Sequence, residues 1–197
     1  MKKLILSLVF VTLINTNSFS YESDPKIFIG ELVNDVIKIL SDKNISKIDK
    51  SKKVENIALE HVDVNALGMY TLGAARKTLD GETLKKYKNL FEKYFLKSLT
   101  SRLSDYSEKK FVIIDADQKS ETYTIVSSKI AESSSDPEIK INWRVYTKDP
   151  NKPLVRDLIV EGLSLAKTQK EEFASILGSN NNDINVLFQK LEEFINN

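Results

Sequence analysis

Hydrophobic residues recur at helical spacing through the first part of the chain. The first run follows Asp24 and Pro25, which suit the cap and the first turn of a helix. Its apolar positions are Ile29, Leu32, Val33, Val36, Ile37 and Leu40. After a polar linker over 41–44, a weaker helical segment carries Val54, Ile57, Ala58 and His61. We expect two amphipathic helices here.

Two more helices are predicted before the pattern changes. Asp63 begins a short helix that Gly73 closes. A longer helix is predicted from about Asp80 to Tyr106, with an apolar side rich in aromatic residues. The apolar positions of the two helices are Val64, Leu67 and Tyr70, then Leu84, Tyr87, Leu90, Phe91, Tyr94, Phe95, Leu99, Leu103 and Tyr106. We interpret the cluster of Lys85, Lys86 and Lys88 as the solvated side of the longer helix.

After Lys110 apolar residues recur at every second position, which predicts strands over 111–117, 122–131, 138–148 and 154–160. Turn residues over 117–120, 133–137 and 148–153 separate them. The third strand alternates most regularly and places Ile139, Ile141, Trp143 and Val145 on one face. One buried face, one wetter face and short connections favour an antiparallel meander.

Two helices close the chain. Ser164 is the expected N-cap of the first, which Gly178 stops, and Asp183 is the expected cap of the second. Helices, then four strands, then helices predict an α+β fold: a four-stranded antiparallel meander sheet with helices packed on one face.

The first twenty residues read as a cleavable signal peptide. Lys2 and Lys3 precede an apolar run over 4–14, and 18–20 offers a small-x-small cleavage site. An uncleaved membrane anchor is the alternative, but the run is shorter than the roughly 20 residues that span a bilayer. We therefore expect residues 21–197 to form a single exported domain.

Composition narrows the class of partner. Without Lys2 and Lys3 the basic count falls from 29 to 27 against 28 acidic residues, a net charge of −1. A net charge so close to zero creates no overall electrostatic field that would attract nucleic acid or an anionic membrane surface. The chain has no cysteine, and a domain of this length buries a sufficient core without disulfides.

No catalytic or metal-binding motif stands out. His61 is the single histidine, and without cysteine it lacks the convergent ligands of a metal site, so we expect a structural role. Ser164 lacks the second glycine of a nucleophile elbow. Gly162 is interpreted as a bulge or a close backbone approach. Asp115 and Asp117 share a strand face, which we interpret as a solvated strand end.

The most informative segment runs over 157–177, where an apolar strand meets Glu161-Gly162 and passes into a helix through Ser164 and on to Phe173. This pattern resembles the MlaC family, also called toluene-tolerance auxiliary proteins. The resemblance covers most of residues 21–197. It includes Asp157, the Asp63-led helix with Thr71-Leu72-Gly73 and Arg76, and the aromatic residues of the long helix.

The resemblance implies a non-enzymatic periplasmic phospholipid carrier without a cofactor, in which an apolar cavity between sheet and helices holds one diacyl phospholipid by its tails. It also implies docking to an inner-membrane MCE-domain/ABC transporter complex and to an outer-membrane lipoprotein–porin complex, the system that maintains outer-membrane lipid asymmetry. A monomer is expected. The implied lipid-binding residues are Leu163, Leu165, Phe173, Ile176, Tyr94, Phe91, Leu99, Trp143, Val145, Val160, Tyr70 and Leu72.

The chain departs from the family pattern at Ala75, over 154–156 and at Gln169, which puts individual pocket contacts in question. Two roles for Arg76 stay open: it contacts a headgroup or a partner, or it forms a surface salt bridge. Two other functions also stay open. One is a cavity-bearing periplasmic enzyme, which the lack of a nucleophile or metal site disfavours. The other is a non-lipid interaction module with a filled core.

Overall fold

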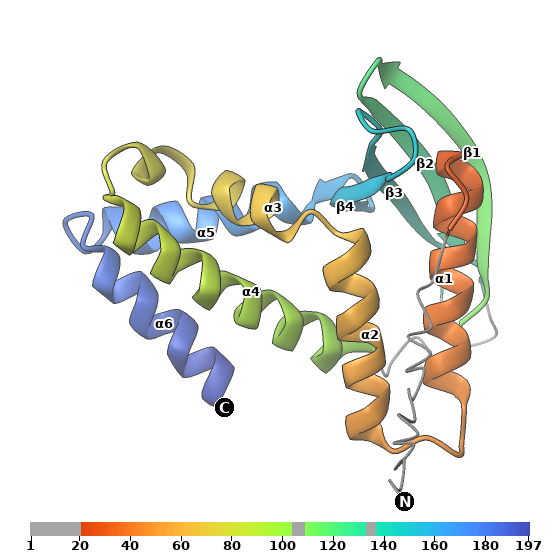
Figure 1. The fold of residues 1–197 in the computed structure, drawn as a ribbon, viewed down its shortest axis with the longest axis horizontal. Helices are drawn as coiled ribbons and strands as arrows, with labels where there is room; N and C mark the ends of the chain where they lie inside the picture. The colour runs from red at the N-terminus through yellow and green to blue at the C-terminus, as the bar shows by residue number, and fades with distance from the viewer. Residues whose placement is uncertain (1–20, 104–108, 133–136) are drawn as a thin grey trace, which may run out of the picture.

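The computed structural model describes residues 21–103, 109–132 and 137–197. These residues form six α-helices, a short 3-10 helix and one five-stranded sheet (Figure 1). The helices are α1 (Pro25–Ser41), α2 (Lys47–His61), α3 (Val64–Thr71), η1 (Gly73–Lys77), α4 (Gly81–Leu103), α5 (Leu165–Gly178) and α6 (Ile184–Asn196). The strands are β1 (Phe111–Ser120), β2 (Tyr123–Ile130), β3 (Ile139–Tyr146), β4 (Leu154–Val160) and β5 (Leu163–Ser164).

The predicted helix starts are confirmed. Asp24, Asp63, Ser164 and Asp183 each precede a helix and accept a backbone N–H of its first turn. This contact satisfies donors that the helix itself leaves unpaired. Gly73 follows α3 with φ +62°. The predicted end of the long helix at Tyr106 lies outside the described residues.

The sheet is an antiparallel meander in the order β1-β2-β3-β4-β5, as predicted, but it has five strands rather than four. The extra strand, β5, has only two residues, too few to produce a period-two pattern. The turn predicted over 117–120 was also wrong. Asp117 pairs with Ile125 and Ser120 with Tyr123, so β1 continues through these polar residues and the turn falls at 121–122.

Two hydrophobic cores lie side by side in the molecule. The first joins the sheet to α1 and α2, and α1 packs along β1 and β2 (Figure 1). The second lies among α3, α4, α5 and α6. Val62, at the end of α2, packs against both cores. The two cores therefore meet at the connection between α2 and α3.

No helix within the described ranges is both long and apolar enough to cross a membrane.

Candidate functional site

One row, apolar except for Ser128, crosses all five strands of the sheet. Ile113 pairs with Ser128, Ser128 with Ile141, Ile141 with Val160, and Val160 with Leu163. Directly paired residues in antiparallel strands share a face, so the row lies on one side of the sheet. Ser128 and Ile141 are buried, Val160 is half-buried, and Leu163 is 69% exposed. The inner face of the sheet thus continues into solvent at its β5 edge.

A second row passes through Trp143. Val126 pairs with Trp143 and Trp143 with Leu158, and all three contribute to the sheet core. The Trp143 indole N–H donates to Ser128 Oγ at 2.8 Å, and Ser128 Oγ donates to the Ile141 carbonyl at 3.1 Å. These bonds satisfy the polar atoms of the two side chains. The face therefore presents apolar surface, the chemistry that acyl chains require.

A two-residue turn sets the position of Leu163. Glu161 and Gly162 have φ +49° and +83°, the two positive values of a type I′ hairpin turn. The Glu161 N–H donates to the Lys140 carbonyl at 3.0 Å, and the Glu161 carboxylate accepts the Lys140 N–H. No atom lies within 4 Å of a Cβ added at Gly162. The interpretation of Gly162 as a bulge or close approach was therefore wrong, because the turn's φ requires the glycine.

Asp157 fixes the start of α5 to the sheet. It is 3% exposed, and its carboxylate accepts the Ser164 hydroxyl at 2.6 Å and the Ala166 N–H at 3.0 Å. Ser164 Oγ in turn accepts the Lys167 N–H at 3.0 Å. Arg144 Nη1 lies 3.6 Å from the same carboxylate. The Ser164 hydroxyl is thus engaged as a helix cap, while the chain's single histidine, His61, packs on Tyr21 and Phe28.

The implied lipid-binding residues do not form one cluster. The helical core or its edge contains five of them: Phe91, Tyr94, Phe173, Leu72 and Ile176. The sheet core or its edge contains three: Val145, Leu99 and Trp143. Three others are exposed, namely Leu163, Leu165 and Tyr70, and Val160 is half-buried on β4. A pocket that uses all of them would lie between the two cores and open near Leu163. That pocket remains a prediction.

Tyr94 brings one polar atom into the helical core. Its hydroxyl donates to Gln169 Oε1 at 2.7 Å, and Gln169 Nε2 donates to Glu172 Oε2 at 2.8 Å. The Tyr94 ring centre lies 4.9 Å from that of Phe194 and 6.0 Å from that of Phe173. Gln169, where the chain departs from the family pattern, therefore supplies the hydrogen-bond partner of this aromatic cluster.

Arg76 and His61 have local contacts. Arg76 is exposed and donates to the Met69 carbonyl at 3.1 Å, near the end of α3. The His61 ring is buried, with centroid distances of 4.5 Å to Tyr21 and 5.8 Å to Phe28. Within the described part of the chain, no group of His, Asp and Glu side chains could hold a metal ion.

No sequence pattern predicted the hydrogen-bonded contact between Asp63, at the start of α3, and Arg156 on β4. Arg156 Nε and Nη2 donate to Asp63 Oδ2 at 2.8 and 2.6 Å, and Nη1 donates to the Tyr123 hydroxyl at 3.0 Å. The guanidinium lies 3.4 Å from the centre of the Tyr146 ring. Asp63 and Arg156 are 93 residues apart, so no local pattern signals their contact.

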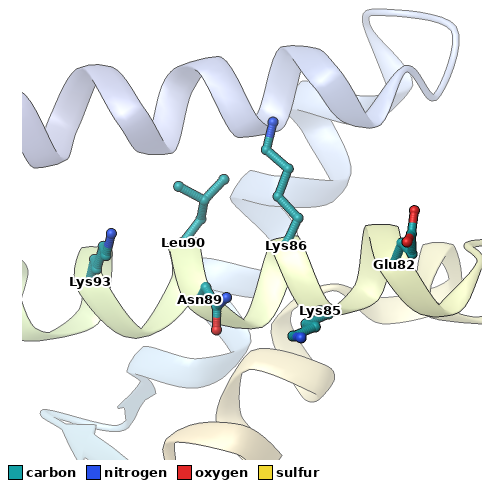
Figure 2. Close-up of a pocket in the computed structure, with 6 residues that line it drawn as sticks. All are labelled: Glu82, Lys85, Lys86, Asn89, Leu90 and Lys93. Atoms are coloured by element: carbon teal, nitrogen blue, oxygen red, sulfur yellow. The ribbon is translucent and has the colours of Figure 1, made fainter.

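The structure also contains a hollow of about 360 Å³ on the exposed side of α4 (Figure 2). Its lining residues are Glu82, Lys85, Lys86, Asn89, Leu90 and Lys93. None of them is an implied lipid-binding residue, and a basic, open surface is unsuited to acyl chains.

Comparison with known proteins adds to this geometry. A family model described as "MlaC protein" matches residues 30–193. Among solved structures, the fold is similar to that of a phospholipid-binding protein from Ralstonia solanacearum, determined in complex with a phospholipid. The two chains are 18% identical, with a TM-score of 0.71 over 88% of this chain and 97% of the other. A search of curated proteins found no match.

Proposed function

The chain belongs to the MlaC family, and we propose that it is a periplasmic phospholipid carrier. In this proposal the protein takes up a diacyl phospholipid at one membrane complex, shields the acyl chains from water, and releases the lipid at another. The observation that carries the proposal is the family match over 30–193, which covers the helical core and all of the sheet core except its first residues, Phe28 and Ile29. A fold shared with a protein solved with a bound phospholipid supports it.

Moving acyl chains through water sets the physical requirement. Each methylene that leaves a bilayer costs about 0.8 kcal/mol, so two long chains represent some tens of kcal/mol. Only extensive dry apolar surface offsets such a cost. The rows that run from Ile113 to Leu163 and through Trp143 offer that surface. In the proposal the tails lie between the sheet and the helical core, and the headgroup stays in water.

The finer parts of the proposal rest on the family. Residues 1–20 would direct export and be removed. The carrier would act as a monomer between an inner-membrane MCE-domain/ABC transporter complex and an outer-membrane lipoprotein–porin complex, maintaining outer-membrane lipid asymmetry. Catalysis is not part of the proposal, since the Ser164 hydroxyl is engaged by Asp157 and by the Lys167 N–H.

Native mass spectrometry of residues 21–197, with lipid extraction from the same sample, tests the carrier function. We expect a one-to-one adduct that extracts as a diacyl phospholipid. A protein that keeps its apo mass after incubation with phospholipid vesicles would contradict the proposal. Turnover of a lipid or ester substrate by the purified protein would favour the enzyme instead.

A matched pair of variants tests the position of the pocket. Leu163 and Ile48 are 69% and 68% exposed, but Leu163 continues the apolar face of the sheet whereas Ile48 lies on α2. Because both side chains are mostly in water, glutamate at either position should cost little folding stability. We expect Leu163→Glu to lower lipid occupancy several-fold and Ile48→Glu to leave it unchanged. Equal occupancy in the two variants would place the pocket elsewhere.

A further inference from the structure

The exposed side of α4 carries a basic hollow, which we define by Glu82, Lys85, Lys86, Asn89, Leu90 and Lys93. Five of these six residues are exposed, and only Leu90 is half-buried. Figure 2 shows Lys86 and Leu90 pointing toward α6, whereas Lys85 and Asn89 point to the other side of the helix. The hollow thus runs across the outer surface of α4, away from the buried Phe91.

One lysine of the hollow already has partners. Lys86 Nζ lies 3.9 Å from Glu192 Oε1 and 4.7 Å from the centre of the Phe188 ring, both on α6. These contacts direct Lys86 toward α6. Among the described residues, Lys85 and Lys93 form no ion pair. Their ammonium groups are available to an anion from outside the chain.

The spacing of these two lysines indicates the size of that anion. Lys85 and Lys93 are eight residues apart on one helix, about 12 Å at 1.5 Å per residue. A single phosphate or carboxylate does not span that distance, but about four residues of an extended peptide do. Leu90 offers an apolar contact between them, and Asn89 offers an amide that donates and accepts.

We infer that the basic hollow docks an acidic segment of a protein partner, with carboxylates at Lys85 and Lys93 and an apolar side chain over Leu90. The inference rests on the proposed function, since a carrier must dock at its donor and its acceptor. Residues 21–197 carry a net charge of −1, so the attraction for an acidic segment comes from the lysines of the basic hollow and not from the domain as a whole. Exposed ion pairs are individually weak and screened by salt. Docking of this kind is transient, as a shuttling carrier requires.

The test uses residues 21–197 labelled with ¹⁵N and two synthetic peptides, one of glutamate around a central leucine and one with glutamine for each glutamate. Amide shifts report where each peptide binds. We expect the acidic peptide to shift amides of α4 around the basic hollow, and its affinity to fall as salt rises. The glutamine peptide should not bind.

Matched variants make the test specific. Lys85→Glu with Lys93→Glu should weaken binding about tenfold or more. Lys52→Glu with Lys53→Glu, the same charge change on two exposed lysines of α2, should leave affinity within about twofold. Lys88→Glu, on α4 but outside the hollow, is the corresponding single control for Lys93→Glu.

Three results would overturn the inference: equal losses in the paired variants, binding of neither peptide, or binding to phosphatidylglycerol vesicles without binding to the acidic peptide. Lipid content of every variant is measured in parallel by native mass spectrometry. Variants that keep their lipid and lose the peptide confirm the docking site separately from the carrier function. A wild-type protein that binds the peptide but never lipid would contradict the proposed function alone.

Discussion

Asp157 and Ser164, seven residues apart across the β4–β5 turn, share a hydrogen bond of 2.6 Å between the buried Asp157 carboxylate and the Ser164 hydroxyl. The same carboxylate accepts the Ala166 N–H at the start of α5. Both residues belong to the segment that resembles the MlaC family. Their contacts show that this segment connects the sheet to α5 through hydrogen bonds. Its conspicuous polar residues have structural roles, and the adjacent Leu163 is presented to solvent.

Replacing Asp157 with alanine tests this connection. The change leaves the Ser164 hydroxyl and the buried Ala166 N–H without their acceptor, and Arg144 loses its nearby carboxylate. We expect a loss of about 3 kcal/mol in the free energy of unfolding. That corresponds to a melting temperature about 6–12 °C lower for a domain of this size. Differential scanning calorimetry measures it.

Asp115→Ala is the control for Asp157→Ala. Asp115 is an exposed carboxylate of the edge strand β1, so its removal should change stability by less than about 0.5 kcal/mol. Equal melting temperatures for the two variants would show that the Asp157 hydrogen bonds contribute nothing beyond a surface charge.

The contrast between Asp157 and Arg156 shows how far sequence alone could reach. Local patterns predicted the cap at Ser164, because capping depends on residues within one turn. The two-residue strand β5 escaped detection because its pairing depends on the positive φ of Glu161 and Gly162. The Arg156–Asp63 contact was not predicted, since a salt bridge across 93 residues leaves no trace in local periodicity. The same limit applies to a pocket whose walls come from both cores.

Arg156→Lys tests the contact between α3 and the sheet. Lysine keeps the charge but cannot reproduce the two hydrogen bonds that Arg156 donates to Asp63. It also loses the hydrogen bond to Tyr123 and the planar stacking on the Tyr146 ring. We expect the free energy of unfolding to fall by about 1–2 kcal/mol, measured by urea denaturation. Arg76→Lys, at an exposed arginine with one backbone contact, should cost less than about 0.5 kcal/mol. A larger loss for Arg76→Lys would contradict this ranking.

Gly162→Ala isolates the backbone requirement of the β4–β5 turn. An added Cβ at Gly162 meets no atom within 4 Å, so the φ of +83° alone determines the cost. We expect a destabilisation of about 1–2 kcal/mol. Gly178→Ala, at the end of α5, also meets no atom, and its backbone needs no positive φ. The Gly178 variant should be neutral or slightly stabilised, and the reverse order of thermal stabilities would refute the turn assignment.

His61 gives the fold a pH dependence below neutrality. Burial lowers its pKa from the usual value of about 6.5, and Lys152 acts in the same direction, whereas the nearby Glu60 opposes them. Its Nε2 lies 3.8 Å from Glu60 Oε2, and the ring packs on Tyr21 and Phe28. Within the described residues, this buried nitrogen has no hydrogen-bond partner. The folded state therefore favours the neutral imidazole.

The sign of the effect follows from proton binding. As pH falls below about 6.5, the unfolded chain binds a proton at His61 before the folded protein does, so the free energy of unfolding decreases. The decrease stops once pH is below the folded pKa. His61 is the chain's only histidine, so its imidazole resonances in an NMR titration report this pKa directly, and we expect a midpoint below 6.5. In His61→Gln the decline of melting temperature between pH 7 and pH 5 should be shallower than in the wild type. An NMR midpoint above 6.5, or an unchanged decline in the variant, would show that burial does not hold His61 neutral.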